Sequence, residues 1–203
     1  VGGHNYNDPT RGRIYRVTPA SGKLPAAVHT GPVTTLKEAL AGFRSPNLAV
    51  AFLAREYLLG HPDLAVRELS LLDLASDPLA SARRLWLLDR LGDSSRAAVL
   101  EALKSPESAT RAQALRILRR HGATYQAQIL ELASDTAPEV RTEFLLAVPT
   151  FDAGTAVAAW LKLAEDFTGS DRMYLEALKI AARGREEQIL AALKLKEQEH
   201  WTE

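Results

Sequence analysis

The fold of this chain is decided by the stretch at 77–91, DPLASARRLWLLDRL. Asp77 and Pro78 form a typical helix start, because a carboxylate oxygen caps free backbone amides and proline lacks a donor where none is needed. Arg84 is followed four and seven residues later by Leu88 and Leu91, which lie on the same stripe of a helix. The stretch therefore predicts an amphipathic helix.

The same pattern recurs along the chain at intervals of about 30 residues, as in a repeat architecture. A small polar residue precedes proline at three of the starts, and two looser starts follow: Ser45-Pro46, Asp77-Pro78, Ser105-Pro106, Asp135 to Pro138, and Gly169 to Asp171. An arginine with two spaced apolar residues recurs as well: Arg84, Leu88 and Leu91; Arg111, Leu115 and Leu118; Arg141, Leu145 and Val148. The repeated unit is therefore a helix, a turn and a second helix.

Helix pairs follow from these starts, and a lone helix ends the chain. We expect the pairs at 33–42 with 46–60, 63–75 with 78–91, 94–104 with 106–121, 124–134 with 138–148, and 153–166 with 171–183, and the lone helix at 185–200. One pair cannot bury its apolar face alone, so the pairs must stack to build a core. The predicted fold is all-α, an α-solenoid of about five helical hairpins plus a terminal helix.

Residues 1–32 differ in composition from the rest and form an N-terminal arm. Positions 1–12 are rich in Gly, Asn, Asp and Pro, which favour loops. Positions 13–18, RIYRVT, alternate as a short β-strand does, and Pro19 ends the segment. Because no later segment alternates, we expect this strand to pair with a sheet upstream of the chain. The alternative is an arm that lies along the helices.

Composition excludes several kinds of chemistry. The 203 residues include 25 basic and 25 acidic side chains and no cysteine. Without cysteine there are no disulfides, thiolate metal sites, cysteine nucleophiles or covalently attached c-type haem. Zero net charge counts against a dedicated nucleic-acid binder, and no apolar run is long enough to cross a bilayer. The histidines lack metal-binding spacing, so we expect no metal site. No glycine-rich phosphate loop occurs either, and we expect no cofactor and no catalytic residue.

The helical region resembles HEAT repeats in its polar or proline starts, its recurring arginine and its spaced Leu and Ala. The resemblance covers residues 33–200, and the signatures of tetratricopeptide and ankyrin repeats are absent. It implies a HEAT-like repeat domain at 33–203, with an armadillo-like helical architecture that serves protein–protein interaction.

Two further segments, GHNYNDPTRGRIYRV at 3–17 and DRMYLEAL at 171–178, resemble bacterial membrane-bound dehydrogenases of the sorbosone dehydrogenase type. In that family a HEAT-like region follows a β-propeller and precedes a c-type haem domain. The resemblance implies that residues 1–32 are the tail of a preceding propeller, that the chain is a linker, and that its location is periplasmic. Because the chain lacks a Cys-x-x-Cys-His motif, the redox chemistry of such a protein lies outside it.

Three arginines at one register position are the first candidate site. If the second helices line the concave face, Arg84, Arg111 and Arg141 form a polar ladder able to grip an acidic partner or a phosphate. The alternative is that each arginine hydrogen-bonds to carbonyls or an aspartate of the neighbouring repeat and holds the stack together.

The terminal helix supplies the second candidate site. Ile189, Leu190 and Leu193 predict an apolar face that is exposed unless further protein covers it. Trp201 has the large side chain that is typical of an interface anchor. We therefore expect Trp201, Ile189 and Leu193 to contact sequence outside this chain.

The sequence favours a non-catalytic scaffold or spacer that contacts other domains of its parent chain or a protein partner, with no nucleic acid and no membrane insertion. The alternative is an enzyme built on HEAT-like repeats, such as a DNA alkylpurine glycosylase or a bilin lyase. A glycosylase of that kind needs a basic concave groove with aromatic residues and an acid. The basic cluster Arg116, Arg119, Arg120 and His121 has a simpler explanation, because it falls at a predicted helix C-terminus and favours the helix dipole.

Overall fold

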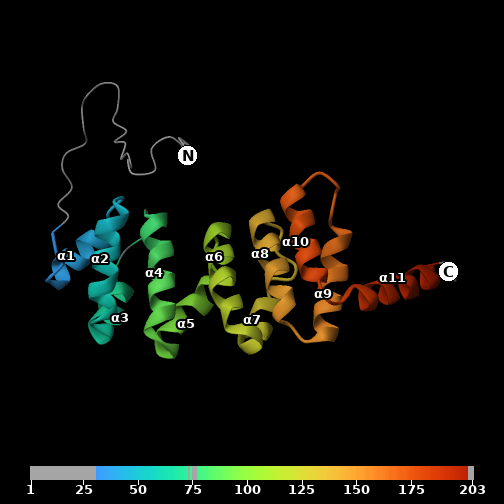
Figure 1. The fold of residues 1–203 in the computed structure, drawn as a ribbon, viewed down its shortest axis with the longest axis horizontal. Coiled ribbons are helices and arrows are strands. Elements are labelled where there is room, and N and C mark those ends of the chain that lie inside the picture. Colours follow the sequence, from blue (N-terminus) through green and yellow to red (C-terminus); the bar gives the residue numbers. More distant parts are fainter. Residues whose placement is uncertain (1–30, 73, 75–76, 201–203) are drawn as a thin grey trace, which may run out of the picture.

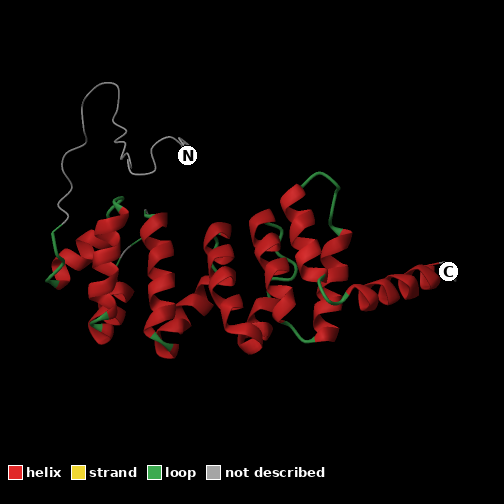
Figure 2. Cartoon of the chain, in the orientation of Figure 1, coloured by secondary structure: helices red, strands yellow, loops and turns green. Residues whose placement is uncertain are grey.

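The computed structural model describes residues 31–72, 74 and 77–200, and every regular element within these ranges is a helix (Figure 2). In chain order the helices are α1 (Leu36–Phe43), α2 (Leu48–Leu59), α3 (Pro62–Leu71), α4 (Pro78–Leu91), α5 (Asp93–Ala102), α6 (Ser108–Leu118), η1 (Arg119–Tyr125), α7 (Gln126–Leu130), α8 (Pro138–Ala147), η2 (Val148–Thr150), α9 (Ala153–Glu165), α10 (Arg172–Ala182) and α11 (Glu186–His200). The all-α prediction is confirmed for this part of the chain. The predicted strand at 13–18 lies outside the described residues, as does nearly all of the arm at 1–32.

The second helices of the predicted pairs form a row. Figure 1 shows α2, α4, α6, α8 and α10 side by side along the long axis, and each packs against the next. The predicted pairs correspond to α1 with α2, α3 with α4, α5 with α6, α7 with α8 and α9 with α10, and the lone helix corresponds to α11. This arrangement is compatible with an α-solenoid-like fold.

Two of the predicted helix starts are confirmed by their capping contacts. The Asp77 carboxylate accepts from the backbone amide of Ala80 (2.9 Å), and Pro78 is the first residue of α4. Asp171 likewise accepts from the amide of Tyr174 (3.0 Å) at the start of α10. A short polar side chain before the first helical turn thus satisfies an amide that the helix itself leaves free.

The two Ser-Pro starts are placed two residues too early by the sequence. Each serine hydroxyl accepts from the backbone amide two residues on: Ser45 from Asn47 and Ser105 from Glu107, both at 3.2 Å. The serine therefore stabilises a local turn, and the helix begins only after it. Helix α2 begins at Leu48 with Asn47 as its cap.

The predicted helix at 106–121 is also too long. Helix α6 ends at Leu118, and a 3₁₀ segment follows in which Gly122 has a φ of +63°. That left-handed conformation suits glycine and reverses the chain. Helix α7 is correspondingly shorter than the predicted 124–134 and ends at Leu130.

The hydrophobic core divides at α4. Leu87 and Leu88 of α4 belong to one buried cluster with Phe43, whereas Leu85 belongs to a second cluster with Phe144. Because α4 contributes to both clusters, it joins the N-terminal helices to the rest of the row.

One of the predicted contact residues on the terminal helix α11 is buried within the chain. Ile189 is only 4% exposed, because α11 packs against α9 and covers this side chain. Leu190 and Leu193 are exposed at 56% and 37%, so the apolar face is narrower than predicted. Ile189 is therefore core within this chain, and Trp201 lies outside the described residues.

Candidate functional site

The arginines of the predicted ladder are engaged within the chain. Arg111 forms a two-bond contact with Asp135, with its Nε 2.7 Å from Oδ2 and its second terminal nitrogen 3.0 Å from Oδ1. It also donates to the carbonyls of Ser105 and Pro106. The hydrogen bonds from Arg111 lower the pKa of Asp135. Arg111 thus fastens α6 to the loop that precedes α8.

The other two arginines of the ladder make comparable contacts. Arg141 of α8 donates to the Tyr174 hydroxyl of α10 (2.9 Å) and forms an ion pair with Asp166 (3.0 Å). Arg84 donates to the carbonyl of Leu72 (3.3 Å), in the connection between α3 and α4. The contacts of Arg111 and Arg141 match the stack-holding alternative, whereas Arg84 contacts a carbonyl of its own predicted unit.

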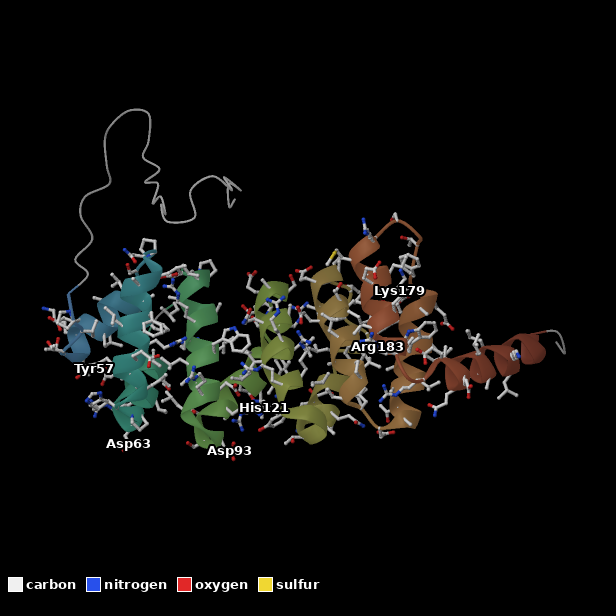
Figure 3. All side chains as sticks on the ribbon, viewed as in Figure 1. Tyr57, Asp63, Asp93, His121, Lys179 and Arg183 are labelled. Atoms are coloured by element: carbon white, nitrogen blue, oxygen red, sulfur yellow. The ribbon has the colours of Figure 1, made fainter. Side chains whose placement is uncertain are left out.

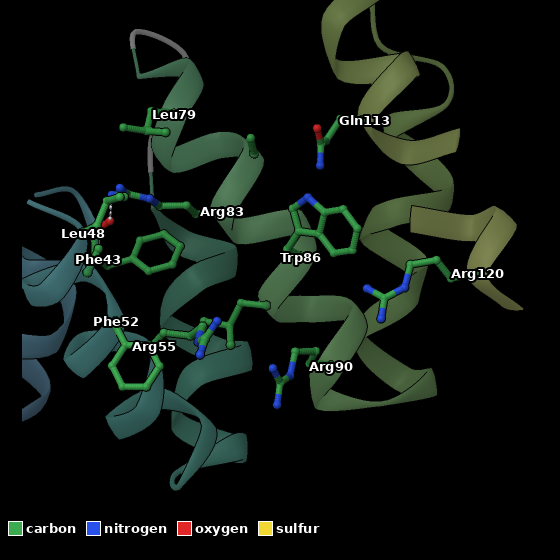
Figure 4. Close-up of a pocket in the computed structure, with 13 residues that line it drawn as sticks. Phe43, Leu48, Phe52, Arg55, Leu79, Arg83, Trp86, Arg90, Gln113 and Arg120 are labelled. Atoms are coloured by element: carbon green, nitrogen blue, oxygen red, sulfur yellow. Dashed lines mark hydrogen bonds between the residues drawn. The ribbon is translucent and has the colours of Figure 1, made fainter. Parts of the chain in front are cut away.

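A groove of about 670 Å³ lies over α2, α4 and α6 (Figure 4). We call it the arginine groove; its lining is Phe43, Leu48, Ala51, Phe52, Arg55, Leu79, Ala82, Arg83, Trp86, Leu87, Arg90, Gln113 and Arg120. On α2 the lining includes positions 48, 52 and 55, and on α4 positions 79, 83, 86 and 90. Steps of three and four residues place each set on one helix face.

Apolar side chains form one part of the groove and are unusually accessible. Leu48 is 78% exposed, Phe52 52% and Leu79 51%. Figure 4 shows Leu79 near the N-terminal end of α4 and Trp86 farther along the same helix, between α4 and α6. Clustered exposed apolar residues with a charged border are typical of a surface that binds a partner.

Two of the groove arginines already have partners. Arg83 donates to the carbonyls of Phe43 (2.9 Å) and Ser45 (2.7 Å), so it caps the end of α1. Arg55 pairs with Glu56 (2.8 Å), and its guanidinium lies over the ring of Phe52, 4.9 Å from the centroid. These side chains shape the wall of the groove.

Arg90 and Arg120 differ from the other two. Both are exposed, and neither forms a hydrogen bond or an ion pair with any described residue. The Arg120 guanidinium lies over the indole of Trp86, 5.1 Å from the ring centroid, which orients it without neutralising its charge. Arg90 lies in the last turn of α4, where the helix dipole favours a cation.

A buried polar cluster contains the sequence neighbours of these two arginines. Asp89, which is 8% exposed, accepts from His121 (2.7 Å) and from Nε of Arg96 (2.9 Å). Arg90 and Arg120 are the chain neighbours of Asp89 and His121. The cluster therefore ties α4 to α5 and to η1. Figure 3 shows His121 of this cluster, and Figure 4 shows the side chains of Arg90 and Arg120 in the groove.

Most of the predicted basic cluster is neutralised. Arg116 and Arg119 of that cluster both pair with the buried carboxylate of Glu143 on α8. His121 pairs with Asp89, so Arg120 alone remains available. The sequence marked this cluster but gave no means of separating Arg120 from its neighbours, because the partners lie 27 and 32 residues away along the chain.

The lining of the groove offers apolar contacts, aromatic rings and guanidinium hydrogen-bond donors. Its described lining combines aliphatic, aromatic and arginine side chains with one glutamine and includes no carboxylate. The glycosylase alternative needs an acid in such a groove. Within the described ranges no group of three or more His, Asp or Glu is arranged to hold a metal ion.

None of the described helices is long and apolar enough to span a lipid bilayer. Comparisons of the chain with protein families, with curated proteins and with solved structures find no match.

Proposed function

We propose that this chain is a non-catalytic HEAT-like α-solenoid module that binds a protein partner in the arginine groove. One observation carries the proposal: the same groove is lined by two unpaired arginines, Arg90 and Arg120, and by exposed apolar side chains such as Phe52 and Leu79. Such a combination of aromatic, aliphatic and arginine side chains is typical of protein interfaces.

The solenoid part of the proposal is supported by the repeated inter-helix contacts. Arg111 and Arg141 occupy the same register position in successive units, and each reaches a residue of the following unit. A contact repeated from unit to unit is what a stacked architecture requires. The row of α2, α4, α6, α8 and α10 supplies the extended face on which the groove lies.

The setting of the module is proposed from the family resemblance. The module would stand between a propeller and a c-type haem domain in a periplasmic dehydrogenase of the sorbosone dehydrogenase type, and its partner would be one of those domains or a separate protein. Sequencing of the gene on both sides of the region that encodes this chain tests the setting. Flanking sequence that encodes neither a propeller nor a haem-attachment motif contradicts it.

Site-specific photocrosslinking tests the binding function. A photoreactive phenylalanine analogue at position 52, inside the groove, is expected to capture a protein in cells that express the natural protein. The matched control places the same analogue at position 71, because Leu71 of α3 is 75% exposed and does not line the groove. Equal capture at both positions, or capture at neither, contradicts a partner-binding groove.

A further inference from the structure

We propose that the occupant of the arginine groove is an acidic linear segment with a bulky apolar residue at one end. This inference rests on the proposed function and adds the chemistry of the partner. It makes Arg90 and Arg120 the specificity-determining residues of the groove.

The charge balance of the groove is the first argument. Its described lining holds four arginines and no acidic residue, although the whole chain has a net charge of zero. Elsewhere Arg96, Arg111 and Arg141 have carboxylates at 3.0 Å or less. Arg55 pairs with Glu56 beside the groove, so the unneutralised positive charge is that of Arg90 and Arg120, which an acidic occupant would balance.

The identity of the cations is the second argument. A guanidinium presents planar paired donors that match both oxygens of a carboxylate. Arg120 lies stacked over Trp86 and retains free donor groups, and Arg90 is exposed near it at the end of α4. Two adjacent carboxylates on an occupant can thus be bound, and the contact of Arg120 with Trp86 reduces the side-chain entropy that this arginine loses on binding.

The distribution of apolar groups gives the occupant a direction. Leu48 and Leu79 lie at the N-terminal ends of α2 and α4, whereas Arg55 and Arg90 lie toward the opposite ends (Figure 4). A segment that lies along the groove therefore places its apolar residue against Leu48 and Leu79 and its acidic residues against Arg90 and Arg120. The apolar end supplies burial, and the acidic end supplies specificity.

Nucleic acid fits the groove less well. Phosphates would satisfy Arg90 and Arg120, but the exposed leucines at the other end would remain beside a polar backbone. Single-stranded nucleic acid also uses several aromatic platforms along a continuous basic track. We therefore retain nucleic acid as an outcome of the test.

The test uses a fluorescein-labelled peptide with two leucines followed by four glutamates, and fluorescence anisotropy as the readout. The chain is expected to bind this peptide, with an affinity that falls as salt is added. The double variant Arg90→Glu and Arg120→Glu is expected to bind about tenfold more weakly or not at all. The control Arg67→Glu, on α3 outside the groove, is expected to bind normally.

The double variant is expected to fold, because neither arginine forms a hydrogen bond with any described residue. Thermal unfolding of the double variant is expected to stay cooperative, with a slightly lower midpoint because the contact of Arg120 with Trp86 and the favourable position of Arg90 at the end of α4 are lost. Equal binding of a peptide with glutamine in place of glutamate overturns the inference. So does tighter binding of a single-stranded oligonucleotide, or self-association of the chain that the double variant abolishes.

The photocrosslinking experiment separates the two levels of the proposal. Capture at position 52 that persists in the double variant leaves the proposed function standing and overturns the acidic occupant. Capture that the double variant removes supports both. Absence of specific capture removes the proposed function itself.

Discussion

His121 and Asp89 form a hydrogen bond across two elements, with Nε2 of the imidazole 2.7 Å from Oδ1 of the carboxylate. The same oxygen accepts from Arg96 of α5, so one buried carboxylate joins α4, α5 and η1. This junction lies where the hydrophobic core divides into two clusters. The junction is next in the sequence to Arg90 and Arg120 of the groove.

Removal of the carboxylate is expected to cost more stability than removal of the imidazole. Asp89→Ala removes a partner from both Arg96, which is 11% exposed and keeps its contacts with Asp93 and Tyr125, and His121, and it should lower the free energy of unfolding by about 2 kcal/mol. His121→Ala removes one hydrogen bond from a partly exposed ring and should cost about 1 kcal/mol. Urea denaturation measures both values, and the reverse order would refute the central role of Asp89.

The contact between Arg111 and Asp135 should contribute measurably to the stack. Arg111→Ala leaves Asp135, whose side chain is 7% exposed, without its charged partner and should lower the free energy of unfolding by about 2 kcal/mol. Arg67→Ala is the control, because that exposed arginine pairs with its neighbour Glu68 on the surface of α3 and should cost less than about 0.5 kcal/mol. Similar losses in chemical denaturation for the two variants would exclude the proposed stack-holding role.

Asp152 should make stability depend on pH in the acid range. Its carboxylate caps α9, and the hydrogen bond from the backbone amide of Thr155 is the main reason why its pKa falls from 3.8 to about 2. A group with a lowered pKa in the folded state stabilises the fold above its unfolded pKa, and this contribution is lost as pH falls through the folded value. Here the loss begins near pH 4 and is complete below about pH 2.

Carbon-detected NMR titration of the Asp152 carboxyl group checks its pKa directly. In urea denaturation, Asp152→Asn should be less stable than the parent chain at pH 6, and the difference should shrink as the pH is lowered toward 2. A difference that stays constant with pH would show that the charge of Asp152 has no part in capping α9.

Two helical glycines should respond oppositely to replacement by alanine. A Cβ at Gly42 would lie 3.1 Å from Cβ of Ala54 and 3.2 Å from Cγ1 of Val50, so α1 and α2 must separate. Gly42→Ala should therefore destabilise the chain by about 1 kcal/mol, because overpacking outweighs the gain in helix propensity. Gly154→Ala in α9 meets only a side-chain oxygen at 3.7 Å and should stabilise by about 0.5 kcal/mol. Thermal unfolding would contradict the packing argument if both variants gained stability.

The helices were predictable because their signals are local. Asp77 and Asp171 cap helices as their sequence positions indicate, and the spacing of apolar residues gave the order of the pairs. The errors occurred where a local turn competes with a helix. Ser105 delays the start of α6, and Gly122 ends the helical path that the periodicity alone would extend.

The candidate site was predictable only in part. The sequence marked Arg84, Arg111 and Arg141 by their register, and the structure gives all three of them partners within the chain. The sequence also marked Arg120 as one of four basic residues, but it gave no signal for Arg90. A stripe of arginine and apolar residues at steps of three and four on α4 was the available clue, and the same pattern also describes an ordinary helix surface.

For the described residues, the sequence by itself determined the helical character, the helix order and the local caps, since these depend on residues within one or two turns of each other. Only the tertiary structure decided which arginines are neutralised and which remain free. That outcome depends on carboxylates brought together from distant positions: Arg111 meets Asp135 and His121 meets Asp89, whereas Arg90 and Arg120 meet none among the described residues. The burial of Ile189 against α9 was decided in the same way, because helix packing selects one face of an apolar stripe and leaves the other exposed.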